Sequence, residues 1–109
     1  MSTQTPLPPA RVAVHGHLRF PPERVPDILP HLRTLAEATR QNDGCIAYEV
    51  ALDPFDRGVI RFSELWPDQQ TFSQHVLAPH VGPWRAAVQS CGLLERQFTV
   101  YDITGARSA

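Results

Sequence analysis

The sequence of 109 residues predicts a single α+β domain with the element order strand, helix, strand, strand, helix, strand. Three observations predict this class: segments that alternate apolar and polar residues, segments in which apolar residues recur at helical spacing, and Pro or Gly clusters between them. The length suits one hydrophobic core. The domain is expected to span residues 11–104, between a flexible tail over residues 1–10 and a short tail over residues 105–109.

The first strand is predicted over residues 11–20, because apolar and polar residues alternate there. Pro21 and Pro22 end this strand, and apolar residues then recur at helical spacing up to a stop signal at Gly44. Pro30 lacks the amide that would bond one turn back, so the first helix is expected to start late or to bend at this residue.

An antiparallel hairpin is predicted next, with strands over residues 45–52 and 59–66 around the turn-rich segment 53–58. A buried sheet face on such strands would carry every second residue. The hairpin therefore supplies the second and third strands of the expected sheet.

The second helix is predicted to begin after Asp68, whose carboxylate can accept from the free amides of a first turn. Pro79 and Pro83 are expected to break this helix, and a further short helix is expected to stop at Gly92. The last strand is predicted over residues 95–103, which are rich in aromatic and β-branched side chains.

The predicted four-stranded antiparallel sheet carries its helices on one face and leaves the other face bare. Alternation places several apolar residues on both faces of the strands. A second copy packed sheet against sheet would cover the bare face, so a homodimer is expected.

Composition and charge exclude several function classes. The net charge is −1, with ten basic and eleven acidic residues scattered along the chain, so no nucleic-acid partner is expected. The N-terminus resembles neither a secretory signal nor a membrane anchor, so a cytoplasmic location is expected. Cys45 and Cys91 are expected to be free thiols. No GxGxxG, phosphate-binding loop or GxSxG occurs, so no nucleotide or flavin site is expected.

Two pairs of histidines are candidates for chemistry. His15 and His17 lie two apart on a strand and could supply half of a metal site, but two ligands are not a site. We interpret them as polar members of a sheet face, hydrogen-bonded across the dimer interface. His75 and His80 flank the break between the later helices, where an imidazole could act as a general base.

Aromatic and charged residues accompany the second histidine pair. Trp66, Trp84 and Arg85 lie near it in sequence and are plausible parts of a ligand pocket. The alternative is a helix-capping His with two core Trp residues. Glu64 shares a strand face with Trp66 and is a weak signal for a pocket role, and Tyr48 is more typical of a core residue than of an acid.

An ordered set of short motifs resembles a known family. These are Gly-Cys-Ile-Ala-Tyr-Glu-Val over residues 44–50, Glu-Leu-Trp over residues 64–66, and His75 followed by Ala-Pro-His over residues 78–80. Over residues 11–104 the chain resembles the antibiotic biosynthesis monooxygenase family of dimeric α+β barrels. The resemblance implies a ferredoxin-like fold, a dimer formed through the sheets, and a pocket in each subunit between sheet and helices.

The resemblance leaves the reaction open, because the family includes cofactor-free oxygenases of quinols and polyketide phenols, haem-degrading enzymes and isomerases. The haem-degrading branch uses an Asn, a Trp and a His at positions that hold Gly16, His75 and Arg85 here. All three residues differ from those of the haem-degrading branch, so the resemblance disfavours haem degradation. The resemblance favours the cofactor-free branch, with no metal and no bound cofactor.

The implied reaction is monooxygenation of a small aromatic quinol or polyketide-type phenol by dioxygen. His75 or His80 would be the base, and Arg85 or Tyr48 would stabilise developing negative charge. Trp66, Trp84 and Phe72 are expected to wall an apolar pocket, with Glu64 as a further substrate-binding residue. The alternatives are a non-enzymatic ligand-binding or regulatory dimer, and an isomerase of a small carbonyl compound.

Overall fold

The computed structural model describes residues 9–109. Most of the tail predicted over residues 1–10 therefore lies outside the described residues. Within them, the predicted order of elements and the α+β, ferredoxin-like class are confirmed. The elements are β1 (Val12–Arg19), a 3-10 turn η1 (Pro22–Arg24), α1 (Val25–Asn42), β2 (Ala47–Leu52), β3 (Val59–Trp66), α2 (Gln69–Val76), α3 (Val81–Ser90) and β4 (Glu95–Asp102).

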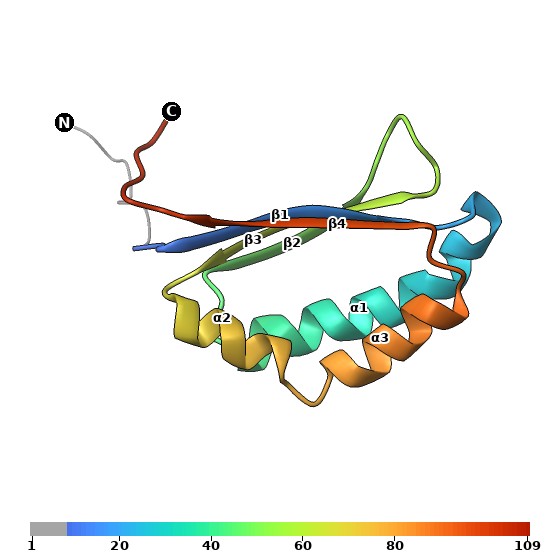
Figure 1. Ribbon diagram of the computed structural model, residues 1–109, viewed down its shortest axis with the longest axis horizontal. Coiled ribbons are helices and arrows are strands. Elements are labelled where there is room, and N and C mark those ends of the chain that lie inside the picture. The colour runs from blue at the N-terminus through green and yellow to red at the C-terminus, as the bar shows by residue number, and fades with distance from the viewer. Residues whose placement is uncertain (1–8) are drawn as a thin grey trace.

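The sheet has the strand order β2-β3-β1-β4, and every neighbouring pair is antiparallel. Figure 1 shows α1, α2 and α3 together under one face of the sheet, while the loop between β2 and β3 projects from the other side. β2 and β4 are the two edge strands. None of the helices in the described part of the chain combines the length and the apolar character that crossing a bilayer requires.

Proline affects the helices less than the sequence suggests. The start of α1 is not delayed to Pro30; the helix begins at Val25 and runs through Pro30. The buried apolar stripe of α1 extends to both sides of this residue, and its burial outweighs one missing hydrogen bond. Pro83 does not break a helix either, because it lies in the first turn of α3, where amides have no intrahelical acceptor. The break is confined to residues 77–80.

The predicted helix ends are confirmed. Gly44 and Gly92 both have φ of 77°, a left-handed conformation that favours glycine after a helix. Asp68 caps α2, where its side chain accepts a hydrogen bond from a first-turn amide at 2.7 Å. Cys45 and Cys91 are free thiols, and burial raises the pKa of the Cys45 thiol.

The hydrophobic core lies between the sheet and α1. Every second residue of β1 and β3 faces the helices, as the alternation predicts. At Gly16 the backbone of β4 comes so close that a Cβ atom would lie 2.4 Å from Gln97 O and from Phe98 Cδ1. Fully or nearly fully buried side chains of this core are Val12, Val14, Leu18, Phe20, Ile28, Leu32, Leu35, Ile60, Phe62 and Trp66.

The opposite face of the sheet is uncovered, and it is less apolar than the sequence analysis expects. The strand register aligns one apolar row across the four strands, formed by Ala47, Leu65, Ala13 and Tyr101. The next two rows are mainly polar. His15 and His17 point to this face, as expected, but His17 pairs within the chain with Glu95 rather than standing free for a partner. The rows beyond the apolar one are Glu49, Ser63, His15 and Thr99, and then Ala51, Arg61, His17 and Gln97.

Candidate functional site

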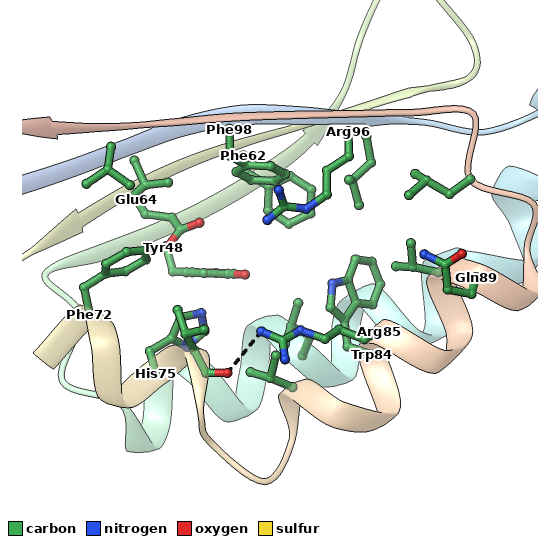
Figure 2. A pocket seen from close by; sticks show the side chains of 18 residues that line it. Tyr48, Phe62, Glu64, Phe72, His75, Trp84, Arg85, Gln89, Arg96 and Phe98 are labelled. Atoms are coloured by element: carbon green, nitrogen blue, oxygen red, sulfur yellow. Dashed lines mark hydrogen bonds between the residues drawn. The ribbon is translucent and has the colours of Figure 1, made fainter.

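A cavity of about 550 Å³ lies between the sheet and the later helices (Figure 2). This volume falls in the range of small-molecule sites, and the walls are mainly apolar and aromatic. Its outer side is formed by β4, most of whose residues are exposed. Six of the eight residues predicted for the site line this cavity, namely Tyr48, Glu64, Phe72, His75, Trp84 and Arg85, whereas Trp66 and His80 do not.

Two titratable side chains, a phenol and a carboxyl group, form the inner end of the cavity. Tyr48 on β2 and Glu64 on β3 are direct cross-strand partners on the helix-facing side of the sheet. Both side chains are buried, with exposed fractions of 3% and 4%. Burial disfavours their charged forms, so it raises the pKa of Tyr48 and raises the pKa of Glu64 to about 7. Near neutral pH, Glu64 can therefore act as either an acid or a base.

Trp66 was expected to form a wall of the pocket, but it does not line the cavity. It packs against residues that do. Its side chain is fully buried under the sheet, and its Nε1 donates a hydrogen bond to Glu64 Oε1 at 3.0 Å. Its ring lies 4.8 Å from the ring of His75 and 5.8 Å from that of Phe72, measured between centroids. Trp66 thus supports three side chains that do line the cavity, Glu64, His75 and Phe72.

His75 is the imidazole on the cavity wall. It lies in the last turn of α2, is 8% exposed, and contacts the Tyr48 ring edge-on at 5.6 Å. Its Nδ1 hydrogen-bonds to Asp43 Oδ2 at 2.6 Å. Burial lowers the pKa of His75 although Asp43 opposes the shift, so burial favours the neutral form of the ring. A neutral imidazole with one engaged nitrogen is a competent proton acceptor.

The two candidate histidines are not equivalent. His80 is the residue before α3, and its Nε2 hydrogen-bonds to the same Asp43 Oδ2 at 2.7 Å. Asp43 is a residue that the sequence analysis missed. One signal could have indicated it: a carboxylate at the C-terminal end of α1 faces the negative end of the helix dipole, where cations are preferred.

The mouth of the cavity is cationic. Arg85 on α3 and Arg96 on β4 point toward the cavity from opposite walls (Figure 2). The dashed line in Figure 2 marks the bond from Arg85 Nη2 to Val76 O at 3.3 Å. The Arg96 guanidinium lies over the Phe98 ring, 4.7 Å from its centroid. An anion that develops in this cavity would therefore meet two positive charges near its opening.

Asp43, His75 and His80 are also the residues that could hold a metal ion. One ligand atom from each lies within 4.8 Å of the others, and two imidazoles with a carboxylate suit zinc or iron. The two observed nitrogen–oxygen distances are those of hydrogen bonds. For His15 and His17, no third ligand completes such a group among residues 9–109.

Comparisons with known proteins agree with this fold. The family model described as antibiotic biosynthesis monooxygenase matches residues 11–87. A structure from Deinococcus radiodurans with that provisional name is 28% identical, with a TM-score of 0.83 over 90% of this chain and 97% of that chain. Another structure of that name is 26% identical, with a TM-score of 0.79 over 86% and 99%. A Caulobacter crescentus structure, 18% identical with a TM-score of 0.82 over 88% and 92%, shows the fold alone. The comparison with curated proteins finds no match.

Proposed function

The chain belongs to the antibiotic biosynthesis monooxygenase family, and from this premise we propose that it oxidises a small aromatic quinol or polyketide-type phenol with dioxygen. The proposed reaction uses no protein-bound cofactor. One oxygen atom enters the substrate, and the other leaves as water with the two hydrogens that the substrate loses. The single observation that carries the proposal is a buried imidazole, His75, which bonds to Asp43 and lies on the wall of an aromatic cavity.

The first step of the proposed reaction is removal of the phenolic proton. His75 is the proposed base, because it lines the cavity and no described residue hydrogen-bonds to its Nε2. His80 lies outside the lining and its Nε2 is bonded to Asp43, so it is a poorer candidate for this step. The phenolate is more electron-rich than the phenol and supplies the electrons that reduce dioxygen.

Negative charge grows on the substrate and on the reduced oxygen as the reaction proceeds. Arg85 and Arg96 line the cavity near its mouth and offer guanidinium groups to this charge. Tyr48 and Glu64 offer hydroxyl hydrogens at the inner end, because burial favours the protonated form of each. The substrate is therefore proposed to place its reacting hydroxyl between His75 and these two groups.

The remaining walls favour an aromatic body and exclude water. Phe72 and Trp84 line the cavity, and the Trp84 ring contacts Phe62 edge-on at 6.3 Å. Flat apolar walls of this kind stack well on a ring system. A low local water content also strengthens every charge interaction within the cavity.

An oxygen electrode tests the proposal directly. Hydroquinones and anthrone-like phenols are added to the purified protein without any cofactor, and oxygen uptake above the uncatalysed rate is expected. His75→Ala should lower turnover by on the order of 10²-fold, because the base is removed. His31→Ala is the matched control, because His31 is an exposed histidine on α1, and it should retain full activity.

His80→Ala separates the two histidines. It should retain more activity than His75→Ala, because His80 does not line the cavity. If both variants turn over a cognate substrate at the normal rate, the assignment of the base is wrong. If the unaltered protein consumes no oxygen with any substrate that it binds, the chain is a binding protein and not an oxygenase.

One observation favours an isomerase as the second candidate. Glu64, with a pKa of about 7, and the neutral His75 make an acid–base pair at one end of the cavity, which suits proton transfer on a small carbonyl compound. Product mass distinguishes the two reactions. Monooxygenation changes the mass by the incorporated oxygen and any hydrogens lost, whereas isomerisation leaves the mass unchanged.

The protein is further proposed to act as a homodimer in the cytoplasm. Support for the dimer comes from the uncovered sheet face and from its apolar row, Ala47, Leu65, Ala13 and Tyr101. A second copy related by a two-fold axis would place this row against its own equivalent.

A further inference from the structure

Three helix ends meet at the carboxylate of Asp43. Asp43 follows α1, His75 lies in the last turn of α2, and His80 precedes α3. The Asp43 side chain is 7% exposed, and its Oδ2 lies 2.6 Å from His75 Nδ1 and 2.7 Å from His80 Nε2. An ionised carboxylate can only accept hydrogen bonds, so both ring nitrogens donate to it.

This arrangement decides which nitrogen of His75 carries the proton. A neutral imidazole has one N–H and one lone pair, and the hydrogen bond made by one nitrogen fixes the role of the other. With Nδ1–H directed to Asp43, Nε2 has the lone pair. Nε2 is also the His75 ring nitrogen for which the described residues offer no hydrogen-bond partner.

We propose that Asp43 is a positioning residue that holds His75 in the Nδ1–H tautomer, with the lone pair of Nε2 available to the cavity, and that His80 holds Asp43 in place. The proposal rests on the proposed function only for its catalytic consequence, because the tautomer is a property of the resting protein. When His75 accepts a proton at Nε2, the resulting imidazolium keeps its bond to the Asp43 carboxylate. The charge is then stabilised where it forms.

His80 has a distinct role in this arrangement. A single donor would leave the Asp43 carboxylate free to rotate away from His75, and a buried carboxylate needs more than one hydrogen bond. His80 supplies the second donor from the start of α3, close to the positive end of that helix dipole. Its side chain is 16% exposed. His80 is therefore a support for Asp43 and has no contact with the cavity.

The other groups around His75 do not compete for Nδ1. Tyr48 contacts the ring edge-on from β2, Trp66 lies against it from β3, and Arg85 on α3 is engaged with a backbone carbonyl. Glu64 is the carboxyl residue that lines the cavity among the described residues, and its Oε1 accepts a hydrogen bond from Trp66. Among the described residues, Asp43 is thus the hydrogen-bond partner that fixes the His75 ring.

Nitrogen NMR of the imidazole rings tests the proposal without any substrate. Protein labelled with ¹⁵N at histidine gives long-range proton–nitrogen correlations that distinguish the two neutral tautomers, and the His75 signals are identified by their loss in His75→Ala. The unaltered protein should show His75 with the proton on Nδ1 above pH 7. His80→Ala should show a smaller excess of this tautomer than the unaltered protein, because Asp43 loses the second donor that holds it beside His75, and an unchanged tautomer ratio in this variant would contradict the role proposed for His80.

Asp43→Asn is the decisive variant. The Asn amide can donate as well as accept, so the preference for Nδ1–H should be lost, and turnover of any cognate substrate should fall by on the order of 10²-fold with little change in KM. Asp27→Asn is the matched control, because Asp27 is an exposed α1 carboxylate paired with Arg24, and it should change neither the tautomer nor turnover. If Asp43→Asn does not fold, the His75 tautomer measured in the unaltered protein still tests the proposal.

Three results would overturn the proposal. The first is a resting His75 with its proton on Nε2. The second is a folded Asp43→Asn variant in which the tautomer is unchanged. The third is a stoichiometric metal ion in the purified protein that is lost in Asp43→Asn, because a metal would then occupy the space that we assign to two hydrogen bonds. Absence of oxygen consumption would contradict the proposed function but leave the tautomer result intact.

Discussion

A carboxyl group buried as deeply as that of Glu64 makes the stability of the folded chain depend on pH. Its pKa is raised to about 7 by burial, against an ordinary value of 4.5. Between these two values the folded chain holds a proton that the unfolded chain has released. The contribution of Glu64 to the free energy of unfolding is therefore present below pH 4.5 and is lost as pH rises through 7.

Glu64→Gln removes this dependence, because the amide is neutral at every pH and can still accept the bond from Trp66. The free energy of unfolding of the variant minus that of the unaltered protein should rise by about 3 kcal/mol from pH 4.5 to pH 8. Urea unfolding at both pH values measures the difference, and titration of His75 largely cancels in it. Glu49→Gln, an exposed carboxylate on the neighbouring strand, should change stability by less than about 1 kcal/mol at either pH. If the difference in free energy of unfolding between Glu64→Gln and the unaltered protein does not change with pH, the raised pKa of Glu64 is wrong.

Residue types alone predicted part of the site. His75, Glu64 and Arg85 could be singled out because imidazole, carboxyl and guanidinium groups are uncommon beside aromatic residues in a core. Asp43 could not, since its importance comes from two residues more than thirty positions away in the chain. Trp66 faces the helices on β3 as Glu64 does, but its fully buried ring packs behind His75 and does not line the cavity.

Strand β1 depends on the absence of a side chain at Gly16. A Cβ atom there would lie 2.4 Å from the backbone oxygen of Gln97, which cannot move without disturbing the pairing of β1 with β4. Gly16→Ala should therefore lower the free energy of unfolding by about 1–3 kcal/mol. Thermal or urea unfolding measures the loss.

Gly82→Ala is the matched control for Gly16→Ala. Gly82 lies in the first turn of α3, and nothing lies within 4 Å of the position that its Cβ would occupy. Alanine has the higher helix propensity, so this variant should be as stable as the unaltered protein or more stable, by up to about 1 kcal/mol. Equal losses in the two variants would show that the close approach at Gly16 is not the cause.

The elements themselves were largely predictable, because a period of two or of 3.6 residues reflects which side faces the core. β3 was predicted with its observed bounds, and β1 and β4 to within one residue at each end. Pro30 misled the prediction that α1 could start late, since tertiary burial on both sides of it keeps the helix continuous from Val25. Pro83 did so because a first-turn position cannot be distinguished from a helix break before the start of α3 is known.

At the scale of the whole molecule, the uncovered sheet face predicts a self-associating protein. Light scattering after size exclusion should give twice the chain mass of 12.2 kDa at micromolar concentration. Leu65→Glu places a charge in the apolar row and should weaken the dimer by 10-fold or more. Ser63→Glu, two residues away in a polar row, is the control and should weaken it less. A monomer of the unaltered protein at these concentrations would contradict the proposed homodimer.

The arrangement of helices under one face was predictable from the order of elements, but the contacts between side chains around the cavity were not. Which side chains meet depends on how α2 and α3 turn at residues 77–80, and that turn brings two histidines to one carboxylate. No spacing in the chain reports such a meeting. The cationic mouth has the same origin, since it combines Arg85 of α3 with Arg96 of β4.

The position of β4 at the edge of the sheet leaves one wall of the cavity lightly packed. Arg96 and Val100 face the cavity yet are exposed. Substituting them disturbs few packed atoms and should change the free energy of unfolding little. Deeply packed residues such as Val14 offer no such freedom. Substitutions in this one strand should therefore change which substrates the cavity accepts while leaving His75 and Asp43 in place.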